Sequence, residues 1–463
     1  MKKEIAYKGF TISELAMAAG GKLLGGDNRR CPTAVCTDSR EAAGESAVMF
    51  AAIRGEHVDG NDYVLRAMEA GACCALCERV PEGEISGSLI LVEDTVAALG
   101  RLGRTVIERV KPITVAITGS VGKTTTKQFT ASVVAQKYEM LATEGNFNSE
   151  IGLPITLLGL TPGCEAAVLE LGMSGAGEIS RMSKICSPDI AVITCIGSSH
   201  IEMLGSREGI RDAKMEIIDG MKEGGRLVLN GDEPLLAGVD GAIYVSACGK
   251  GDYNITNLRS EGMTTRFDLE GEVILRDLMI PAIGTHMTLD AAYAAVVGIL
   301  LGLTEEQIRA GLCAFENTGL RQKITCCDDM TFIEDCYNAN PESMRAALGV
   351  LQTTAGTRKL AVLGDMRELG ENSPAYHLAV GEAASEVCDL LYTFGALAEG
   401  IAEGAAAAGM DEAYIFRFGE EQADELISAL TDELCAGDAV LFKASRAMEL
   451  ERIIEGIKNN RQI

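Results

Sequence analysis

The sequence predicts an α/β protein with three domains, and three observations lead to this prediction. The chain has 463 residues, enough for about three domains of roughly 100 to 200 residues each. From residue 113 onward, short apolar runs alternate with longer segments that suit helices, which is typical of a parallel sheet wound with helices. A Lys-Pro step at residues 111–112 separates this alternating part from the preceding one.

Residues 1–110 form the predicted N-terminal domain. Short helical and strand-like runs follow one another there, and the last of them is a helix in TVAALGRLGRTVIERV, residues 95–110. The residue before a proline is disfavoured in helical conformation, so this helix is expected to end at the Lys-Pro step. The first domain boundary is therefore placed after residue 110.

The predicted central domain spans residues 111–318, and the C-terminal domain spans residues 319–463. In the central domain the expected strands of a mostly parallel sheet are ITVAIT, AAVLEL, DIAVITCI and RLVLN. In the C-terminal domain they are TFIEDC, KLAVLG, LLYTFG and AVLFKA, separated by helical segments rich in Ala and Glu. This second alternation predicts a Rossmann-like α/β domain.

The charge and the hydropathy of the chain exclude several classes of function. Asp and Glu outnumber Lys and Arg by 67 to 41, so the net charge of −26 disfavours binding to nucleic acid or to anionic membranes. The N-terminal residues lack the apolar core of a signal peptide, and the apolar stretch at residues 291–303 is too short to span a bilayer. We expect a cytoplasmic protein that uses neither nucleic acid nor a membrane as a partner.

The fifteen cysteines are scattered along the chain without a secretory signal. That distribution favours reduced thiols that act as small core residues. Cys74 and Cys77 have C-x-x-C spacing, yet no second pair completes a zinc site. We therefore predict no structural metal there.

A glycine-rich turn between a strand and a helix, in ITVAITGSVGKTTTK, predicts a phosphate-binding loop in the central domain. Glycines let backbone N–H groups approach phosphate oxygens, Lys123 neutralises the outer phosphates, and the Thr124 hydroxyl can ligate magnesium. Ile117 stands where the strict P-loop pattern has glycine, so this is a shorter variant, T-G-x-x-G-K-T-T. The loop alone leaves ATP and GTP open. The predicted nucleotide-binding residues are Gly119, Ser120, Val121, Gly122, Lys123, Thr124 and Thr125.

Further motifs follow the loop in the order TEGNFNSEIGLP, LELGMSGAGEI, GSSHIEMLGS, DAKMEI, EDCYNANPESM and LGDMRELG. Together with the loop they resemble the Mur ligase family, and the resemblance runs from TDSR at residue 37 to KASRAMELE at residue 451. Within the family, the motifs are most similar to those of members that join D-alanyl-D-alanine to UDP-N-acetylmuramoyl-tripeptide in peptidoglycan synthesis. These are the partners that the resemblance implies, and we expect a monomer.

The resemblance also implies a reaction. The terminal carboxylate of the tripeptide attacks the γ-phosphate of ATP, and the amine of the dipeptide then displaces phosphate from the acyl phosphate. A carboxylate is a poor electrophile whereas an acyl phosphate has a good leaving group, so the protein has mainly to supply cations and positioning.

Four residues are implied to be catalytic, and Lys123 of the loop is the first. Glu170 matches a magnesium-binding carboxylate which, with Thr124, would hold the ion between the β and γ phosphates. His200 matches the family position near a second Mg²⁺ ion. Lys214, which would otherwise be taken for an exposed helix lysine, matches a lysine carried as a carbamate, an anionic oxygen ligand for that ion. Two Mg²⁺ ions are therefore expected.

The resemblance assigns other residues to the three ligands, and each domain to one of them. Arg321 would reach the ATP phosphates and Asp335 the ribose hydroxyls, although either could be a surface ion-pair residue. Residues 1–110 would bind the UDP-sugar-peptide, residues 111–318 ATP, and residues 319–463 the incoming dipeptide. The predicted substrate-binding residues are Asp38, Ser39, Arg40, Asn146, Asn148, Lys443, Ser445 and Arg446.

The match to the family fails at several positions, of which the clearest are Met287 and Asp290. The family has asparagines there that help to hold the adenine nucleotide, whereas Met offers no useful donor and Asp none when ionised. We therefore expect altered nucleotide affinity or base selectivity, although the preceding His286 is retained. Smaller departures, with Ser, Ala and Cys at family positions for Asn, Gly and Ser, occur at Ser149, Ala444 and Cys336.

Three other functions fit the sequence less well. A sister ligase that adds a diamino acid or extends folate with glutamate is disfavoured, because the D-N-P-R run of the diamino-acid-adding members is missing. A paralogue that binds nucleotide without turnover would have little need for Lys123, Glu170, His200 and Lys214 together. A P-loop kinase or GTPase would leave the motifs of the outer domains unexplained. Whether the tripeptide carries lysine or diaminopimelate stays open.

Overall fold

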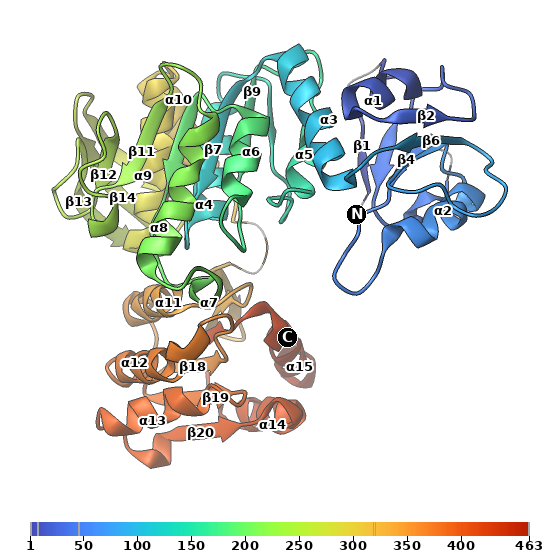
Figure 1. Ribbon diagram of the computed structural model, residues 1–463. Coiled ribbons are helices and arrows are strands. Elements are labelled where there is room, and N and C mark those ends of the chain that lie inside the picture. Colours follow the sequence, from blue (N-terminus) through green and yellow to red (C-terminus); the bar gives the residue numbers. More distant parts are fainter. Residues whose placement is uncertain (1, 7–8, 45–46, 318, 320, 462–463) are drawn as a thin grey trace.

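Three sheets, each from a different third of the chain, build the molecule in this computed structural model, which describes residues 2–6, 9–44, 47–317, 319 and 321–461. The central part adjoins both of the others, and the N-terminal and C-terminal parts extend from it in different directions (Figure 1). Helix α3 (Thr95–Val110) connects the first two parts, because it packs on helices of both. This arrangement confirms the predicted α/β fold class with mostly parallel sheets.

The N-terminal sheet has the strand order β1-β3-β4-β5-β6-β2. Its four inner strands are parallel, and the short edge strands β1 and β2 pair antiparallel with them. The strands are β1 (Lys2–Glu4), β2 (Lys22–Leu24), β3 (Ala34–Cys36), β4 (Val48–Ala51), β5 (Cys74–Cys77) and β6 (Ser88–Leu91), with helices α1 (Ile12–Ala19) and α2 (Val64–Ala70). Cys74 and Cys77 are the two ends of β5 and are both buried.

The central sheet has the order β15-β14-β13-β12-β11-β10-β7-β9-β8. The strands from β8 to β13 in this order are parallel, as predicted. An antiparallel extension of β13, β14 and β15 was missing from the prediction. The strands are β7 (Ile113–Thr118), β8 (Met140–Ala142), β9 (Ala166–Glu170), β10 (Ile190–Ile193), β11 (Arg226–Asn230), β12 (Ile243–Ser246), β13 (Tyr253–Glu261), β14 (Thr264–Glu270) and β15 (Leu275–Ile280).

Helices of the central part cover both faces of its sheet, as the doubly wound arrangement requires (Figure 1). Helices α4 and α9 pack against each other on one face, and α3, α5 and α6 lie toward the N-terminal part. The helices are α4 (Lys123–Val134), α5 (Gly152–Leu157), α6 (Glu178–Cys186), α7 (Ile201–Leu204), α8 (Arg207–Met215), α9 (Thr285–Leu300) and α10 (Glu305–Cys313).

The C-terminal sheet has the order β16-β17-β21-β18-β19-β20, and all of its strands except the edge strand β16 run parallel. Parallel strands alternating with helices give the predicted Rossmann-like part. The strands are β16 (Lys323–Cys327), β17 (Met330–Asp335), β18 (Lys359–Gly364), β19 (Leu390–Phe394), β20 (Ile415–Phe418) and β21 (Ala439–Lys443). The helices are α11 (Pro341–Thr353), α12 (Ser373–Ser385), α13 (Glu399–Ala407), α14 (Ala423–Glu433) and α15 (Glu451–Arg461).

The predicted elements have counterparts in the structure, whereas the domain boundaries remain predictions. Each of the eight predicted strand segments overlaps an observed strand, and the predicted helix at residues 95–110 coincides with α3. The predicted boundary between residues 318 and 319 involves residue 318, which lies outside the described residues.

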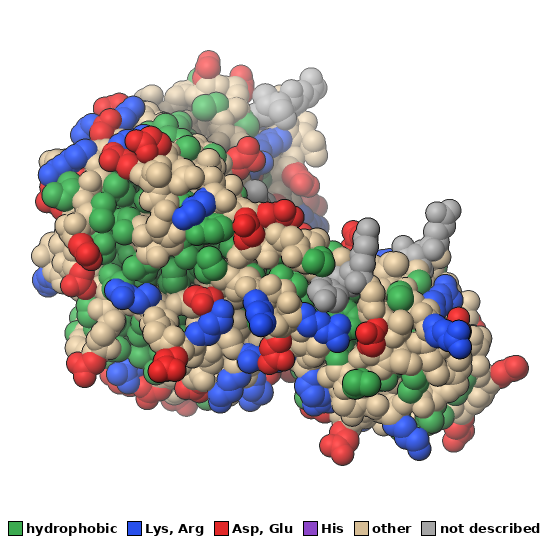
Figure 2. Space-filling view, turned by 90° about the horizontal axis from the view of Figure 1, so that it is seen from above, with side chains coloured by type: hydrophobic (Ala, Val, Ile, Leu, Met, Phe, Trp, Pro, Cys, Tyr) green, Lys and Arg blue, Asp and Glu red, His purple; other side chains and the backbone are tan. Residues whose placement is uncertain are grey.

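The composition also led to expectations about disulfides, membrane-spanning helices and surface charge. No disulfide joins cysteines within the described part of the chain. None of the helices in that part is both long and apolar enough to cross a membrane. Basic and acidic side chains are interspersed on the face that Figure 2 shows.

Candidate active site

The predicted phosphate loop connects the end of β7 to the start of α4. Gly119 and Gly122 have φ values of 151° and 85°, which favour glycine. A Cβ atom at Gly119 would collide with the Thr194 hydroxyl, and one at Gly122 would lie 2.5 Å from Asp290 Oδ1. The loop therefore requires both glycines, and it leads into the N-terminus of α4, where unpaired N–H groups favour anions.

Lys123, the first residue of α4, folds back over this loop. Its Nζ donates to the carbonyl oxygens of Gly119 at 2.7 Å and Ser120 at 3.4 Å. Burial lowers the pKa of Lys123, and the nearby Arg321 lowers it further, whereas Glu170 opposes the shift. The ammonium thus stands among the loop carbonyls, at the place where phosphate oxygens would compete for it.

Glu170 ends β9, and its carboxylate is held on both sides. It is 1% exposed, Oε2 accepts a hydrogen bond from the Thr124 hydroxyl at 2.9 Å, and Oε1 accepts one from Asn148 Nδ2 at 2.7 Å. The backbone N–H of Glu170 donates to Thr143 Oγ1 at 3.0 Å. The structure thus brings three predicted residues together at the carboxyl edge of the sheet, where ligands of open α/β sheets bind. Asn146, in contrast, is exposed.

Lys214, near the end of α8, is 2% exposed, so it is not an ordinary surface lysine. Burial lowers its pKa well below the usual range, and the charge of Lys123 adds to that effect. No hydrogen bond or ion pair of its ammonium is found among the described residues. A buried amine with a lowered pKa has a larger neutral fraction at pH 7, and the neutral amine is the form that reacts with carbon dioxide.

His200 lies in the loop between β10 and α7 and meets the C-terminal part. Its Nδ1 is 2.7 Å from Glu368 Oε2, and the hydrogen bond from His200 lowers the pKa of Glu368. The two preceding residues make contacts across the same boundary. Ser198 Oγ donates to Glu342 at 2.6 Å, and Asn340 Nδ2 donates to Ser199 Oγ at 2.6 Å. Three consecutive residues of the central part are therefore anchored to the C-terminal part.

A pocket between the phosphate loop and the C-terminal part holds the other predicted nucleotide residues. Lys443 Nζ lies 2.6 Å from Asp335 Oδ2, and the Arg321 guanidinium lies 4.1 Å from the centre of the Tyr337 ring. Lys443, which is predicted to bind the substrate, lines this pocket together with the predicted nucleotide residues. The pocket is lined by Ser120, Val121, Gly122, Lys123, Thr125, His286, Met287, Asp290, Arg321, Gln322, Asp335, Tyr337, Asn338, Asn340, Ser343, Ala346, Ala347 and Lys443.

Met287 and Asp290, the clearest departures from the family pattern, are both buried on α9. Asp290 Oδ1 accepts a hydrogen bond from the Thr126 hydroxyl at 2.8 Å. Burial raises the pKa of Asp290 to about 8, so this carboxyl group is mainly protonated at pH 7 and retains a donor. The expectation that Asp290 offers no donor applies only to its ionised form. Met287 is 3% exposed and packs in the core of the central part.

A cavity of about 390 Å³ beside His200 contains Ser445 and Arg446. Both follow β21 and line this cavity, whereas Lys443, the last residue of β21, lines the adjoining pocket beside the phosphate loop. Arg367 and Glu368 complete its charged lining. Two arginines and one carboxylate therefore line this cavity next to His200, which is predicted to lie near a metal ion.

Asp38, Ser39 and Arg40 line a cavity of about 650 Å³ between the N-terminal and central parts. Hydrogen bonds from Arg40 hold the pKa of Asp38 well below its usual range. The cavity also contains Arg66 and, from the central part, Ser149. It therefore joins the predicted uridine-binding motif to the loop that carries Asn148.

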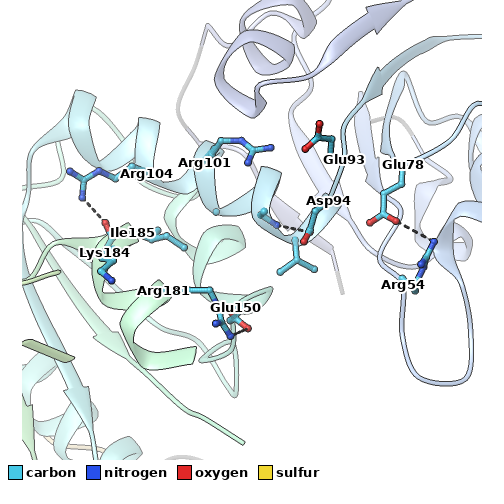
Figure 3. A pocket seen from close by; sticks show the side chains of 13 residues that line it. Arg54, Glu78, Glu93, Asp94, Arg101, Arg104, Glu150, Arg181, Lys184 and Ile185 are labelled. Atoms are coloured by element: carbon cyan, nitrogen blue, oxygen red, sulfur yellow. Dashed lines mark hydrogen bonds and ion pairs between the residues drawn. The ribbon is translucent and has the colours of Figure 1, made fainter. Parts of the chain in front are cut away.

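A second, larger cavity of about 990 Å³ lies between the same two parts and contains none of the predicted site residues. Figure 3 shows two ion pairs on its walls, Arg54 with Glu78 and Arg181 with Glu150. Lys184 also lines it, in α6. The sequence gives no indication of this cavity.

Other side chains in and around the site were also missed. Lys127 is buried and lies four residues after Lys123. Residues four apart are neighbours on a helix face, so this spacing in the sequence could have indicated that the two lysines lie close together. Glu342 lies in the motif EDCYNANPESM and Glu368 in LGDMRELG, and the family resemblance of these motifs implies no role for either carboxylate.

Comparison with known proteins agrees with this geometry. The models of the Mur ligase middle domain and of the Mur ligase glutamate ligase domain match residues 117–298 and 321–446. The UDP-N-acetylmuramoyl-tripeptide–D-alanyl-D-alanine ligase of Bacillus subtilis is 38% identical over 430 residues, which cover 91% of this chain and 92% of that protein.

Two solved structures of the same kind superpose on the chain. The crystal structure of MurF from Acinetobacter baumannii has a TM-score of 0.87 at 30% identity and covers 98% of this chain and 100% of its own. That of MurF from Thermotoga maritima in complex with ADP has a TM-score of 0.80 at 29% identity, covering 93% of this chain and 98% of its own. Because both domain models and these relatives match most of its length, this chain belongs to the Mur ligase family.

Proposed function

We propose that this protein uses ATP to join D-alanyl-D-alanine to UDP-N-acetylmuramoyl-tripeptide, giving the UDP-linked pentapeptide precursor of peptidoglycan. The observation that carries the proposal is the phosphate loop tied to a buried carboxylate, through the 2.9 Å hydrogen bond from Thr124 to Glu170. The Bacillus subtilis relative carries the name of this activity and matches over 92% of its length.

The proposed reaction has two steps. An oxygen of the tripeptide carboxylate attacks the γ-phosphorus of ATP, the bond to the β–γ bridging oxygen breaks, and ADP leaves. The dipeptide amine then attacks the acyl carbon, the C–O bond to phosphate breaks, and the amine proton is lost as the amide forms. Both steps move charge between phosphate oxygens, so fixed cations and N–H donors stabilise them.

The phosphate loop supplies those donors. Lys123 now donates to the carbonyl groups of Gly119 and Ser120, and we infer that it turns to the outer phosphates when the nucleotide enters. Arg321 and Lys443 line the same pocket and add positive charge. A MurF relative was solved in complex with ADP, which supports an adenine nucleotide as the ligand.

The hydroxyl oxygen of Thr124 and the carboxylate oxygens of Glu170, at the end of β9, suit a magnesium ion. A hydroxyl and a carboxylate are the hard ligands that Mg²⁺ prefers, and its remaining positions are usually filled by water and phosphate. Thr124 and Glu170 would hold the ion, and bound Mg²⁺ would neutralise charge on the transferring phosphoryl group.

A second ion would need a ligand that the unmodified side chains lack. No group of three His, Cys, Asp or Glu side chains suited to a metal occurs in the described residues. A carbamate on Lys214 would supply oxygen ligands, and its buried, unpartnered amine is suited to forming one. His200 would join it after leaving Glu368.

The cavities support a place for each substrate. The one around Asp38 and Arg40 would take the UDP moiety, because it opens between the first two parts toward Ser149. The one lined by Ser445 and Arg446 would take the dipeptide, whose carboxylate suits the arginines there. We propose that the protein binds these substrates and ATP in the cytoplasm.

Phosphate release from ATP tests this function when each substrate is omitted in turn. Release should require UDP-N-acetylmuramoyl-tripeptide and D-alanyl-D-alanine together. Release that persists without the dipeptide, or that appears with a single amino acid in its place, contradicts the proposal and favours a sister ligase. Tight ADP binding without any release would identify a paralogue without turnover. Lysine and diaminopimelate tripeptides should be compared in the same assay.

A further inference from the structure

Lys127 is a buried cation to which the proposed reaction assigns no role. It lies on α4, is 5% exposed, and its Nζ donates to the carbonyl oxygen of Thr143 at 2.7 Å. Burial lowers the pKa of Lys127, whereas the nearby Glu170 carboxylate favours its charged form. A buried ammonium is costly to desolvate, so its burial requires contacts that compensate for the lost water.

The acceptor, Thr143, is itself bonded to Glu170. Thr143 directly follows β8 and is 2% exposed. Its hydroxyl accepts the backbone N–H of Glu170 at 3.0 Å, and its own N–H donates to Val168 of the neighbouring strand at 3.0 Å. One residue therefore connects the Lys127 ammonium to the backbone of Glu170.

Helix α4 consequently holds Glu170 at two points. Thr124 and Lys127 are three residues apart, so they lie on the same face of the helix. Thr124 bonds the carboxylate directly, whereas Lys127 acts on the backbone through Thr143. The helix that begins at the phosphate loop thereby sets the distance between that loop and the carboxylate.

We propose that Lys127 is a positioning residue which, through Thr143, fixes Glu170 for binding a divalent cation. The inference rests on the proposed magnesium role of Glu170. Groups that orient metal ligands typically change metal affinity about 10- to 100-fold when they are replaced. Lys127 should therefore affect the cation requirement more than the affinity for either substrate.

The test compares Lys127→Met with Lys137→Met in the full-length protein. Lys137 also donates to backbone carbonyls, those of Leu301 and Gly302 at 3.0 and 2.9 Å, but it is exposed and lies outside the site, so it controls for the loss of a lysine–carbonyl contact. Mn²⁺ binding in the presence of ADP is followed by electron paramagnetic resonance, and the Mg²⁺ dependence of phosphate release is measured in parallel. Lys127→Met should weaken Mn²⁺ binding about 10-fold, and Lys137→Met should leave it unchanged.

Thr143 provides a second pair of variants in case Lys127→Met fails to fold. Thr143→Val removes the acceptor of the Glu170 N–H and should also weaken Mn²⁺ binding, whereas Thr143→Ser should restore it. Wild-type Mn²⁺ affinity in folded Lys127→Met, or in Thr143→Val, overturns the inference. The Glu170→Gln variant separates a failure of the proposed magnesium role of Glu170 from a failure of the positioning role of Lys127. If it too binds Mn²⁺ like the wild type, the magnesium role of Glu170 fails. If it alone is impaired, only the role of Lys127 fails.

Discussion

The hydroxyl of Thr124 lies 2.9 Å from Oε2 of Glu170, which joins the helix after the phosphate loop to the end of the neighbouring strand β9. The two residues are 46 positions apart in the chain. Their contact places a hydroxyl and a carboxylate side by side in a buried position, as a magnesium ion between nucleotide phosphates would require.

Replacing Glu170 by Gln should lower kcat/KM by about 100-fold, which corresponds to about 2.7 kcal/mol of transition-state stabilisation. Glutamine is nearly the same size and can still accept from Thr124, so the loss would be that of the charge. Steady-state phosphate release at several Mg²⁺ concentrations measures it. Wild-type activity of the Glu170→Gln variant at limiting Mg²⁺ would remove Glu170 from the metal site.

Lys214 should make activity depend on carbon dioxide. Removing dissolved carbon dioxide and bicarbonate from enzyme and buffers should reduce the rate of phosphate release, and added bicarbonate should restore it, because the proposed carbamate forms on this buried amine. Lys214→Arg should stay inactive with or without bicarbonate. Equal wild-type rates in both buffers, together with unmodified density at Lys214 in crystals grown with bicarbonate, would exclude the carbamate.

The two cavities between the first two parts can be distinguished by one cation in each. Arg66 lines the cavity of Asp38, and Lys184 lines the larger cavity without predicted residues. Arg66→Ala should raise KM for UDP-N-acetylmuramoyl-tripeptide about tenfold, a loss of about 1.4 kcal/mol of the kind expected for a charged contact to phosphate. Lys184→Ala should leave KM unchanged. The reverse result would place the UDP moiety in the larger cavity.

Asp290 should make stability fall as pH rises. Its pKa is raised from 3.8 to about 8, so the folded protein holds a proton there that the unfolded chain releases. The stabilisation present below pH 3.8 is therefore lost progressively as pH rises through about 8. Asp290→Asn keeps an acceptor for Thr126 but does not titrate. Thermal unfolding from pH 5 to 9 should show wild type losing stability relative to this variant, and parallel profiles would contradict the raised pKa.

The sequence contained enough to predict the fold class and the local shape of the loop, because both depend on patterns within short segments. Apolar runs such as ITVAIT mark buried parallel strands, and the glycines around Lys123 mark the turn. The antiparallel strands at residues 253–280 were missed, since their alternating, partly exposed residues lack such a run.

Contacts between distant residues could not be predicted in the same way. Lys443, predicted to bind the substrate, contacts Asp335, 108 positions away, and lines the same pocket as the predicted nucleotide residues. Asp290 was expected to offer no donor when ionised, and whether it is ionised depends on its burial against α4, which only the folded chain defines. His200 likewise meets Glu368 only because two domains come together.

The transfer of an oxygen atom from substrate to phosphate tests the proposed ligation most directly. The tripeptide is prepared with oxygen-18 in both oxygens of its terminal carboxylate, and the phosphate released with ATP and D-alanyl-D-alanine is analysed by mass spectrometry. Because the acyl phosphate keeps one carboxylate oxygen on phosphorus when the C–O bond breaks, each phosphate should carry one labelled oxygen. Unlabelled phosphate would show that ATP does not activate this carboxylate, and would contradict the account.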